Sequence, residues 1–164
     1  MRRCLTGLIA VTAAGLGLLA PPASAVDAPV GRLGDTLRVH DNNEVTADVT
    51  VVSLEPADVP PGFGYPPRKP HYRVDRANVV VHPLQVPNAY FMNTTFTFNA
   101  VTQTGDGYLP RNNDAPDALQ YALLNAPAGS TVAGGVWWDC YRDLPSTIAL
   151  LDSRTGAQLA QWDV

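Results

Sequence analysis

Hydrophobic and polar residues alternate along several short stretches of this chain. The clearest stretch is Met92–Val101, where every second residue falls on one face: Met92, Thr94, Phe96, Phe98 and Ala100. Because the side chains of a β-strand point to opposite faces in turn, a period of two predicts a strand with one buried face. The same reasoning predicts six more strands: Leu33–His40, Val45–Leu54, Tyr72–His82, Val132–Tyr141, Thr147–Leu151 and Leu159–Trp162.

Turn residues separate the predicted strands, and signals for helices are sparse. The 164 residues include 15 prolines and 13 glycines, and such residues typically interrupt regular structure. The segment Asp152–Gly156 predicts the turn of a closing hairpin, and Ala118–Leu124 fits either a strand or a single helical turn. Seven or eight short strands at this spacing predict an all-β fold, an immunoglobulin-like antiparallel β-sandwich.

The N-terminus has the pattern of a secretory signal peptide, Met1–Ala25. Two arginines precede a mainly apolar run, Leu5–Ala20, and the small residues Ala23-Ser24-Ala25 follow. This order predicts cleavage between Ala25 and Val26. The alternative is an uncleaved anchor, but the run falls short of the roughly 20 residues that span a bilayer. We therefore predict a secreted or envelope-associated protein with one domain, residues 26–164, and no membrane span in the mature chain.

The charge of the mature chain narrows its range of partners, and its cysteine content limits the disulfides it can form. Removing the leader leaves nine basic and fifteen acidic residues, a net charge of −6, which disfavours nucleic acids and anionic membranes as partners. Cys140 is then the only cysteine, so no intramolecular disulfide can form. The alternation of its strand places Cys140 inward as a buried thiol with a raised pKa; the alternative, an intermolecular disulfide, requires exposure.

Several segments together resemble a known family. They are Gly31-Arg32-Leu33-Gly34-Asp35, Phe98-Asn99-Ala100 leading to Gly105-Asp106-Gly107-Tyr108, and the ending from Gly134 to Trp162. In their order they resemble the mycobacterial immunoprotective extracellular protein family, whose members are small secreted antigens. The resemblance implies an immunoglobulin-like fold and secretion. It implies no catalytic residues. The chain departs from the family pattern at Cys140 and in a longer proline-rich loop after Leu54.

That proline-rich loop, Glu55–Pro70, contains residue types that are common at protein interfaces: Phe63, Tyr65, Arg68 and Lys69. One interpretation is a recognition loop that six prolines hold extended. The other, which we favour, is a crossover between the two sheets whose aromatic residues fold back over an open end of the sandwich.

Two adjacent tryptophans lie in one predicted strand, so their rings point to opposite faces. The alternation places Trp138 in the core and Trp137 outward, on the same side as Tyr141. Trp137 and Tyr141 together predict a stacking platform for a sugar ring or an apolar partner. The alternative, which we weigh equally, is that a loop covers Trp137.

Signals for catalysis and metal binding are weak. His40, His71 and His82 have no metal-ligand spacing, and the cluster Asn112-Asn113-Asp114 with Asp117 lacks the order of a calcium loop. No serine lies in a nucleophile elbow, and Asn93-Thr94-Thr95 matches only a glycosylation sequon. We therefore predict no cofactor and no metal.

The predicted function is a secreted, non-enzymatic interaction module that is a monomer or self-associates weakly. We expect it to bind a protein or an envelope glycan through Phe63, Tyr65, Arg68, Trp137 and Tyr141. The alternative is a secreted hydrolase or metal-dependent enzyme whose site is assembled from distant histidines and acids.

Overall fold

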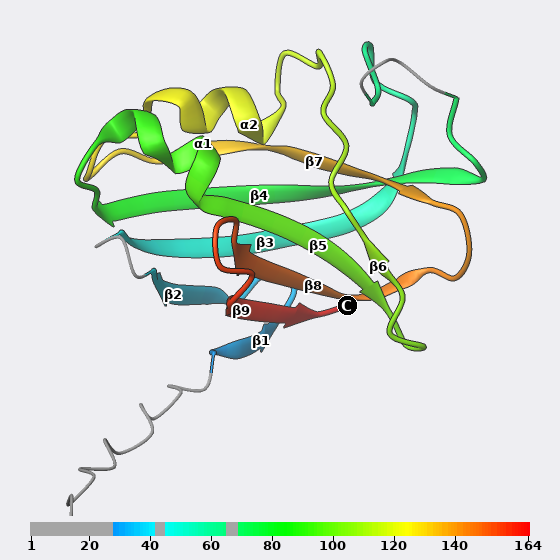
Figure 1. Ribbon diagram of the computed structural model, residues 1–164, viewed down its shortest axis with the longest axis horizontal. Helices are drawn as coiled ribbons and strands as arrows, with labels where there is room; N and C mark the ends of the chain where they lie inside the picture. The colour runs from blue at the N-terminus through cyan, green and yellow to red at the C-terminus, as the bar shows by residue number, and fades with distance from the viewer. Residues whose placement is uncertain (1–27, 42–44, 65–68) are drawn as a thin grey trace, which may run out of the picture.

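The computed structural model describes residues 28–41, 45–64 and 69–164. Within them, two β-sheets face each other as a sandwich (Figure 1). The predicted leader and its cleavage point, Ala25 and Val26, lie outside the described residues. Tyr65 and Arg68 also lie outside them.

The first sheet has five strands in the order β1-β9-β8-β5-β6. Their bounds are β1 Val30–Arg32, β9 Gln158–Asp163, β8 Pro145–Asp152, β5 Phe96–Thr102 and β6 Gly107–Tyr108. The pairs are antiparallel except β1 with β9, which is parallel. The predicted β-sandwich is therefore confirmed, with one parallel pair that the sequence pattern did not indicate.

The second sheet has four antiparallel strands in the order β2-β3-β4-β7. Their bounds are β2 Thr36–His40, β3 Thr46–Ala57, β4 Arg73–Gln85 and β7 Val132–Cys140. Because β3 and β4 are neighbours in one sheet, the proline-rich loop closes a long hairpin. The prediction that it crosses between the sheets is wrong, and its first residues, Glu55 to Ala57, still belong to β3.

The core lies between the sheets and follows the predicted alternation. Ala47, Val49 and Val51 of β3 are fully buried, and they face buried residues of the other sheet: Phe98, Ala100, Ile148, Leu150 and Trp162. Trp138 joins the two sheets directly, because its indole N–H donates to the backbone oxygen of Phe98 at 3.0 Å. A buried tryptophan needs such an acceptor for its N–H group.

One predicted strand begins four residues too early. Met92–Thr95 forms a short helix, α1, which follows the 3-10 turn η1, Ala89–Phe91. The side chain of Asn88 accepts a hydrogen bond from the backbone N–H of Tyr90 and starts the turn. In a helix the buried positions are three or four apart, so Thr95, not Thr94, is buried with Met92.

The ambiguous segment Ala118–Leu124 is helical. It contains α2, Leu119–Ala122, and leads into the 3-10 turn η2, Leu123–Asn125. Both α1 and α2 lie along the same side of the sandwich, near β7, which is the edge strand of its sheet, and near β5, whose neighbour there is the short edge strand β6 (Figure 1). No helix within 28–41, 45–64 or 69–164 is long and apolar enough to cross a membrane.

Candidate functional site

Phe63 and Trp137, two of the predicted binding residues, are buried. Trp137 faces away from the main core, as predicted, but only 5% of it is exposed. It packs with Phe63, which is 3% exposed, in a second, smaller cluster that also contains Val74, Ala115 and Ala118. The prediction of an exposed Trp137 is wrong because the proline-rich loop and the segment 111–118 cover it. The alternative interpretation, in which a loop covers Trp137, agrees with the structure.

Tyr141 is exposed but belongs to another part of the molecule. It is 46% exposed, and its ring lies edge-on to Tyr108, with 5.2 Å between the ring centroids, and to His71 at 6.1 Å. The Trp137 ring instead contacts the guanidinium of Arg76, which lies 4.9 Å from the ring centroid. The described contacts therefore do not join Trp137 and Tyr141 into one platform.

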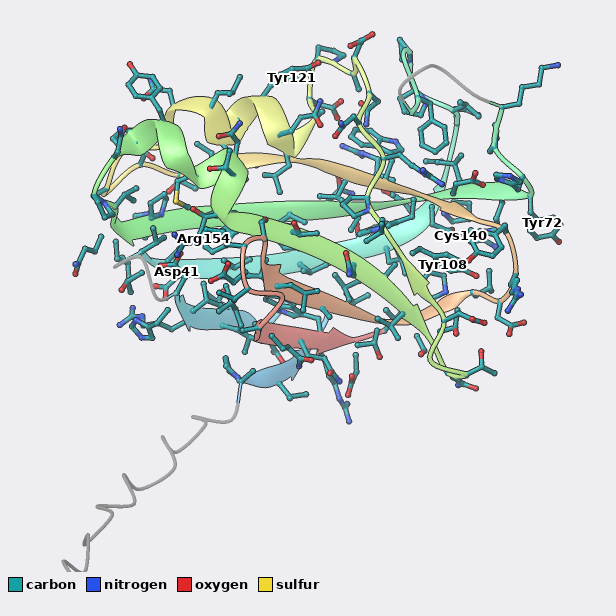
Figure 2. All side chains as sticks on the ribbon, in the orientation of Figure 1. Asp41, Tyr72, Tyr108, Tyr121, Cys140 and Arg154 are labelled. Carbon is teal, nitrogen blue, oxygen red and sulfur yellow. The ribbon has the colours of Figure 1, made fainter. Side chains whose placement is uncertain are left out.

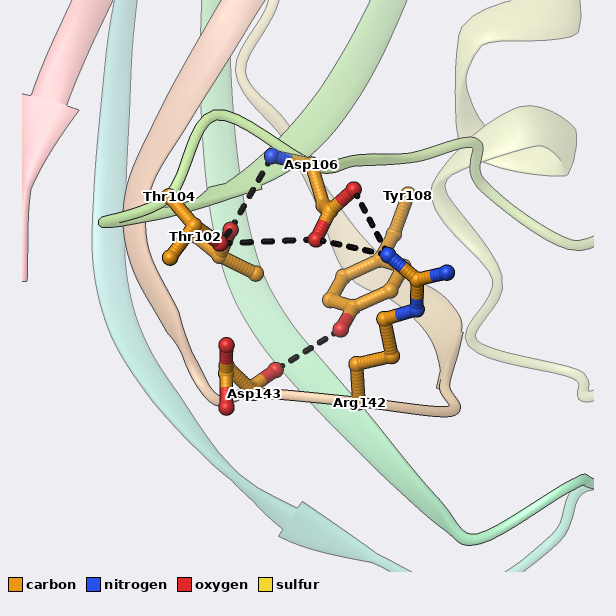
Figure 3. A network of polar contacts seen from close by, with 6 residues as sticks. All are labelled: Thr102, Thr104, Asp106, Tyr108, Arg142 and Asp143. Atoms are coloured by element: carbon orange, nitrogen blue, oxygen red, sulfur yellow. Dashed lines mark hydrogen bonds and ion pairs between the residues drawn. The ribbon is translucent and has the colours of Figure 1, made fainter.

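Polar contacts fix the end of the sandwich where Tyr141 lies. The carboxylate of Asp106 accepts from the guanidinium of Arg142 at 3.3 Å, and the hydroxyl of Tyr108 donates to the backbone oxygen of Asp143 at 2.8 Å (Figure 3). Burial raises the pKa of Tyr108. These contacts tie the turn 102–108 to the loop after β7, which is a structural role.

Cys140 lies at the same end of the molecule, near Tyr108 and Tyr72 (Figure 2). The thiol is fully buried, and burial followed by a hydrogen bond with Asp75 raises its pKa. Asp75 is itself buried between the sheets and pairs with Arg73. A buried thiol of this kind is a poor nucleophile, and burial also removes the exposure that an intermolecular disulfide requires.

The three histidines make separate contacts. His40 bonds with Thr46 on β3, His71 with Asp139 at 2.6 Å, and His82 with the backbone oxygen of Ser130. No group of three or more His, Cys, Asp or Glu residues in the described part of the chain could hold a metal ion. The Asn112–Asp114 cluster is a turn in which Asn113 is buried and its side-chain oxygen accepts from the backbone N–H of Ala115 at 3.0 Å.

A cavity lies where the chain bridges the edges of the two sheets. After β6, the segment 109–125 runs along β7: the N–H of Arg111 donates to the oxygen of Trp137, and the N–H of Gly135 donates to the oxygen of Asp117, each at 2.8 Å. Beneath this segment, between β5 and β7, is a cavity of about 190 Å³. We call it the inner cavity.

Two adjacent glycines of β7 make room for this arrangement. A Cβ on Gly134 would lie 2.6 Å from the backbone of Leu119, so only glycine lets α2 approach the strand. A Cβ on Gly135 would overlap the guanidinium of Arg76 and the ring of Trp137. The two glycines therefore set the positions of α2 and of Trp137, both of which line the inner cavity.

The lining of the inner cavity combines an aromatic wall with amide, hydroxyl and guanidinium groups. Phe96, Phe98 and Trp137 supply the aromatic rings. The polar side chains come from α1, β5, α2, the β8–β9 turn and the bridging segment: Asn93, Thr97, Arg111, Asn112, Asn113, Gln120 and Ser153. Among the described residues, none of those lining the cavity is an aspartate or a glutamate.

A wider hollow adjoins the inner cavity, and we call it the outer cleft. It has a volume of about 540 Å³, and four residues line both spaces: Asn93, Asn112, Asn113 and Gln120. Its rim includes Gly62 and Gly64 of the proline-rich loop, which docks on the bridging segment through the N–H of Gly64 to the oxygen of Asn112 at 2.7 Å. Tyr121, 44% exposed, lies on the rim at α2 (Figure 2).

Sequence reasoning missed most of this site. Arg111, Gln120 and Tyr121 were not predicted, and Asn93 and Asn112 were noted only as part of a sequon and of a polar turn. The proline-rich loop contributes glycines to the rim, whereas Phe63 anchors it from below. Two features of the sequence could have indicated the site: the Gly134-Gly135 pair and the asparagine-rich segment before α2.

The fold and the site define a class: a two-sheet β-sandwich of immunoglobulin type with a ligand-sized hollow on one side. No protein-family model matches the chain, and no curated protein matches it. Among solved structures, it is similar to MPT63, a secreted protein from Mycobacterium tuberculosis. The identity is 24%, the TM-score is 0.61, and the match covers 85% of this chain and 100% of MPT63. The match is to a secreted mycobacterial protein, in agreement with the resemblance seen in the sequence, and it confirms the fold.

Proposed function

We propose that the chain is a secreted, non-enzymatic β-sandwich protein that binds an extracellular protein or glycan in the inner cavity and outer cleft. The observation that carries the proposal is the pair of joined hollows, which are lined by segments distant in sequence and lie beside the buried core. Ligand sites are typically concave, with an apolar wall and a few convergent polar groups. The lining of the inner cavity fits that description.

Two observations support secretion. The first 25 residues have the order of a signal peptide, and the similar structure is that of a secreted protein. Expressed with its leader in a mycobacterial host, the protein should accumulate in the medium or the envelope with Val26 as its first residue. Retention in the cytoplasm with Met1 intact would contradict secretion.

The binding surface differs from the one that the sequence indicated. Phe63 and Trp137 are buried, so their contribution is to support the cavity from within. The residues that we now propose to contact the partner are Arg111, Gln120 and Tyr121, with Asn93 and Asn112 between the two hollows. Tyr65, Arg68 and Tyr141 remain predictions from the sequence alone, and Tyr141 lines neither hollow.

Photo-crosslinking from two exposed positions tests the binding proposal. A benzophenone amino acid replaces Tyr121 on the rim of the outer cleft or, as a matched control, Val52 of β3, which is 49% exposed and does not line either hollow. After irradiation of exported protein, the proposal predicts an adduct from position 121 and none from position 52. Digestion of the adduct with proteases or glycosidases then assigns the partner as a protein or a glycan. Equal adducts from both positions, or none from position 121, would contradict the proposal.

A further inference from the structure

The charge of the inner cavity differs from that of the chain as a whole. The chain carries a net charge of −4, yet no carboxylate among the described residues lines the cavity, and Arg111 does. Four other arginines pair with aspartates: Arg38, Arg73, Arg76 and Arg142. Arg111 makes no ion pair with a described residue. An unpaired guanidinium beside a cavity without acids favours a ligand that carries a carboxylate.

The remaining polar groups suit hydroxyls. Each amide side chain offers a donor and an acceptor side by side, as neighbouring hydroxyls of a sugar ring require. The side-chain amides of Asn93 and Asn112 make no hydrogen bond to a described residue, and Gln120 uses only its N–H₂ group, which donates to the backbone oxygen of Asn113 at 2.9 Å. The inner cavity, of about 190 Å³, opens into the outer cleft, of about 540 Å³, so a sugar ring that reaches the inner polar groups can extend into the wider space.

The β7 edge beside the cavity is not free to pair with an extended peptide. Peptides commonly bind by pairing with a free strand edge, but the chain's own segment 111–118 already occupies the β7 edge beside the cavity. The N–H of Arg111 donates to Trp137 and the N–H of Gly135 donates to Asp117, and a parallel bridge joins Ala118 and Gly135.

We propose that the inner cavity binds one acidic sugar residue, a uronic acid, of an extracellular polysaccharide. The carboxylate of the sugar pairs with Arg111, and its ring hydroxyls bond to Asn93, Asn112 and Gln120. The outer cleft contains Asp114, which repels a second carboxylate, so the adjoining sugar there is neutral or turns its acid group away from Asp114 toward solvent. This inference rests on the proposed function and names its ligand.

A pair of matched probes tests the acid group with the full chain: tri-galacturonic acid and its methyl ester, which keeps every ring hydroxyl and loses the charge. Calorimetry should detect binding of the acid, with an affinity that falls as salt is added, and at least roughly tenfold weaker binding of the ester, which is the effect of losing about one charge-assisted hydrogen bond. Arg111→Gln should weaken binding of the acid to the level of the ester. Arg142→Gln, which changes an exposed arginine at another end of the sandwich, should leave it unchanged.

Other outcomes overturn the inference in distinguishable ways. Equal binding of acid and ester, unaffected by Arg111→Gln, rejects the acidic ligand and retains a glycan site. Equal or tighter binding of a tri-glutamate peptide rejects the sugar. Binding of no probe rejects the inference, whereas the proposed function fails only if the crosslink from position 121 also fails. Because the Arg111 side chain is exposed, the variant should keep the wild-type melting temperature, and this check precedes calorimetry.

Discussion

Gly134→Ala tests whether the contact between β7 and α2 is as close as the structure has it. A Cβ on this residue would lie 2.6 Å from the Cα and N of Leu119, whereas ordinary contact begins at 3.4 Å. The obstacle is backbone, which cannot rotate away as a side chain does, so α2 must move by about 0.8 Å or β7 must bend. Because such overpacking typically costs about 1–3 kcal/mol, the variant should unfold at a temperature lower by roughly 2–12 °C.

The matched control is Gly107→Ala, also in a strand, where a Cβ would have no heavy atom within 4 Å. This variant should stay within about 0.5 kcal/mol of wild type. Urea denaturation of both variants, followed by tryptophan fluorescence, gives the two free energies of unfolding. If Gly134→Ala is as stable as Gly107→Ala, then α2 does not rest on β7, and the inner cavity does not have the walls described.

Two further variants and one labelling experiment test other parts of the structure. The carboxylate of Asp152 accepts hydrogen bonds from the backbone N–H groups of the second and third residues after it, at 2.8 and 3.1 Å. Burial raises the pKa of Asp152, but these hydrogen bonds outweigh burial and hold the pKa below its usual value. The wild-type protein should therefore have a larger free energy of unfolding than Asp152→Asn at pH 7, and the difference should shrink as the pH falls below about 4. A constant difference between pH 7 and pH 2 would contradict this. Cys140 should react with a thiol reagent only after denaturation, because it is buried with a raised pKa; rapid labelling of native protein would refute its burial. Tyr108→Phe removes the hydrogen bond to the oxygen of Asp143 and should lower the free energy of unfolding by about 1 kcal/mol in urea denaturation, and an unchanged value would show that this bond adds nothing.

The strands of the core were predictable because each depends on a local pattern. The alternation in Val45–Leu54 indicates which side chains are buried, and Ala47, Val49 and Val51 are. The alternation gave a wrong prediction at Met92–Thr95, because these residues form a helical turn. The cap at Asn88 and the hydrogen bond from the backbone N–H of Ala126 to the oxygen of Ala89 determine the local structure there.

The candidate site was harder to predict because it is built from separate segments. The alternation correctly directs Trp137 away from the main core, but burial of that ring depends on residues near Phe63 and Ala115, far from it in sequence. Similarly, the inner cavity brings Asn93 and Arg111 to Gly135, and no local motif joins them. The amide side chains and the arginine line one cavity without carboxylates only because the tertiary structure brings their segments together.

The most direct test of the central claim is an NMR titration of the ¹⁵N-labelled protein with tri-galacturonic acid. Binding in the joined hollows predicts chemical-shift changes at the backbone amides of Asn112 and Gln120 and at the indole N–H of Trp137, which line the inner cavity. The resonances of Tyr72 and Tyr141 should stay unchanged. Shifts confined to Tyr72 and Tyr141, or no shift at the residues of the inner cavity, would contradict the binding of an acidic sugar in that cavity.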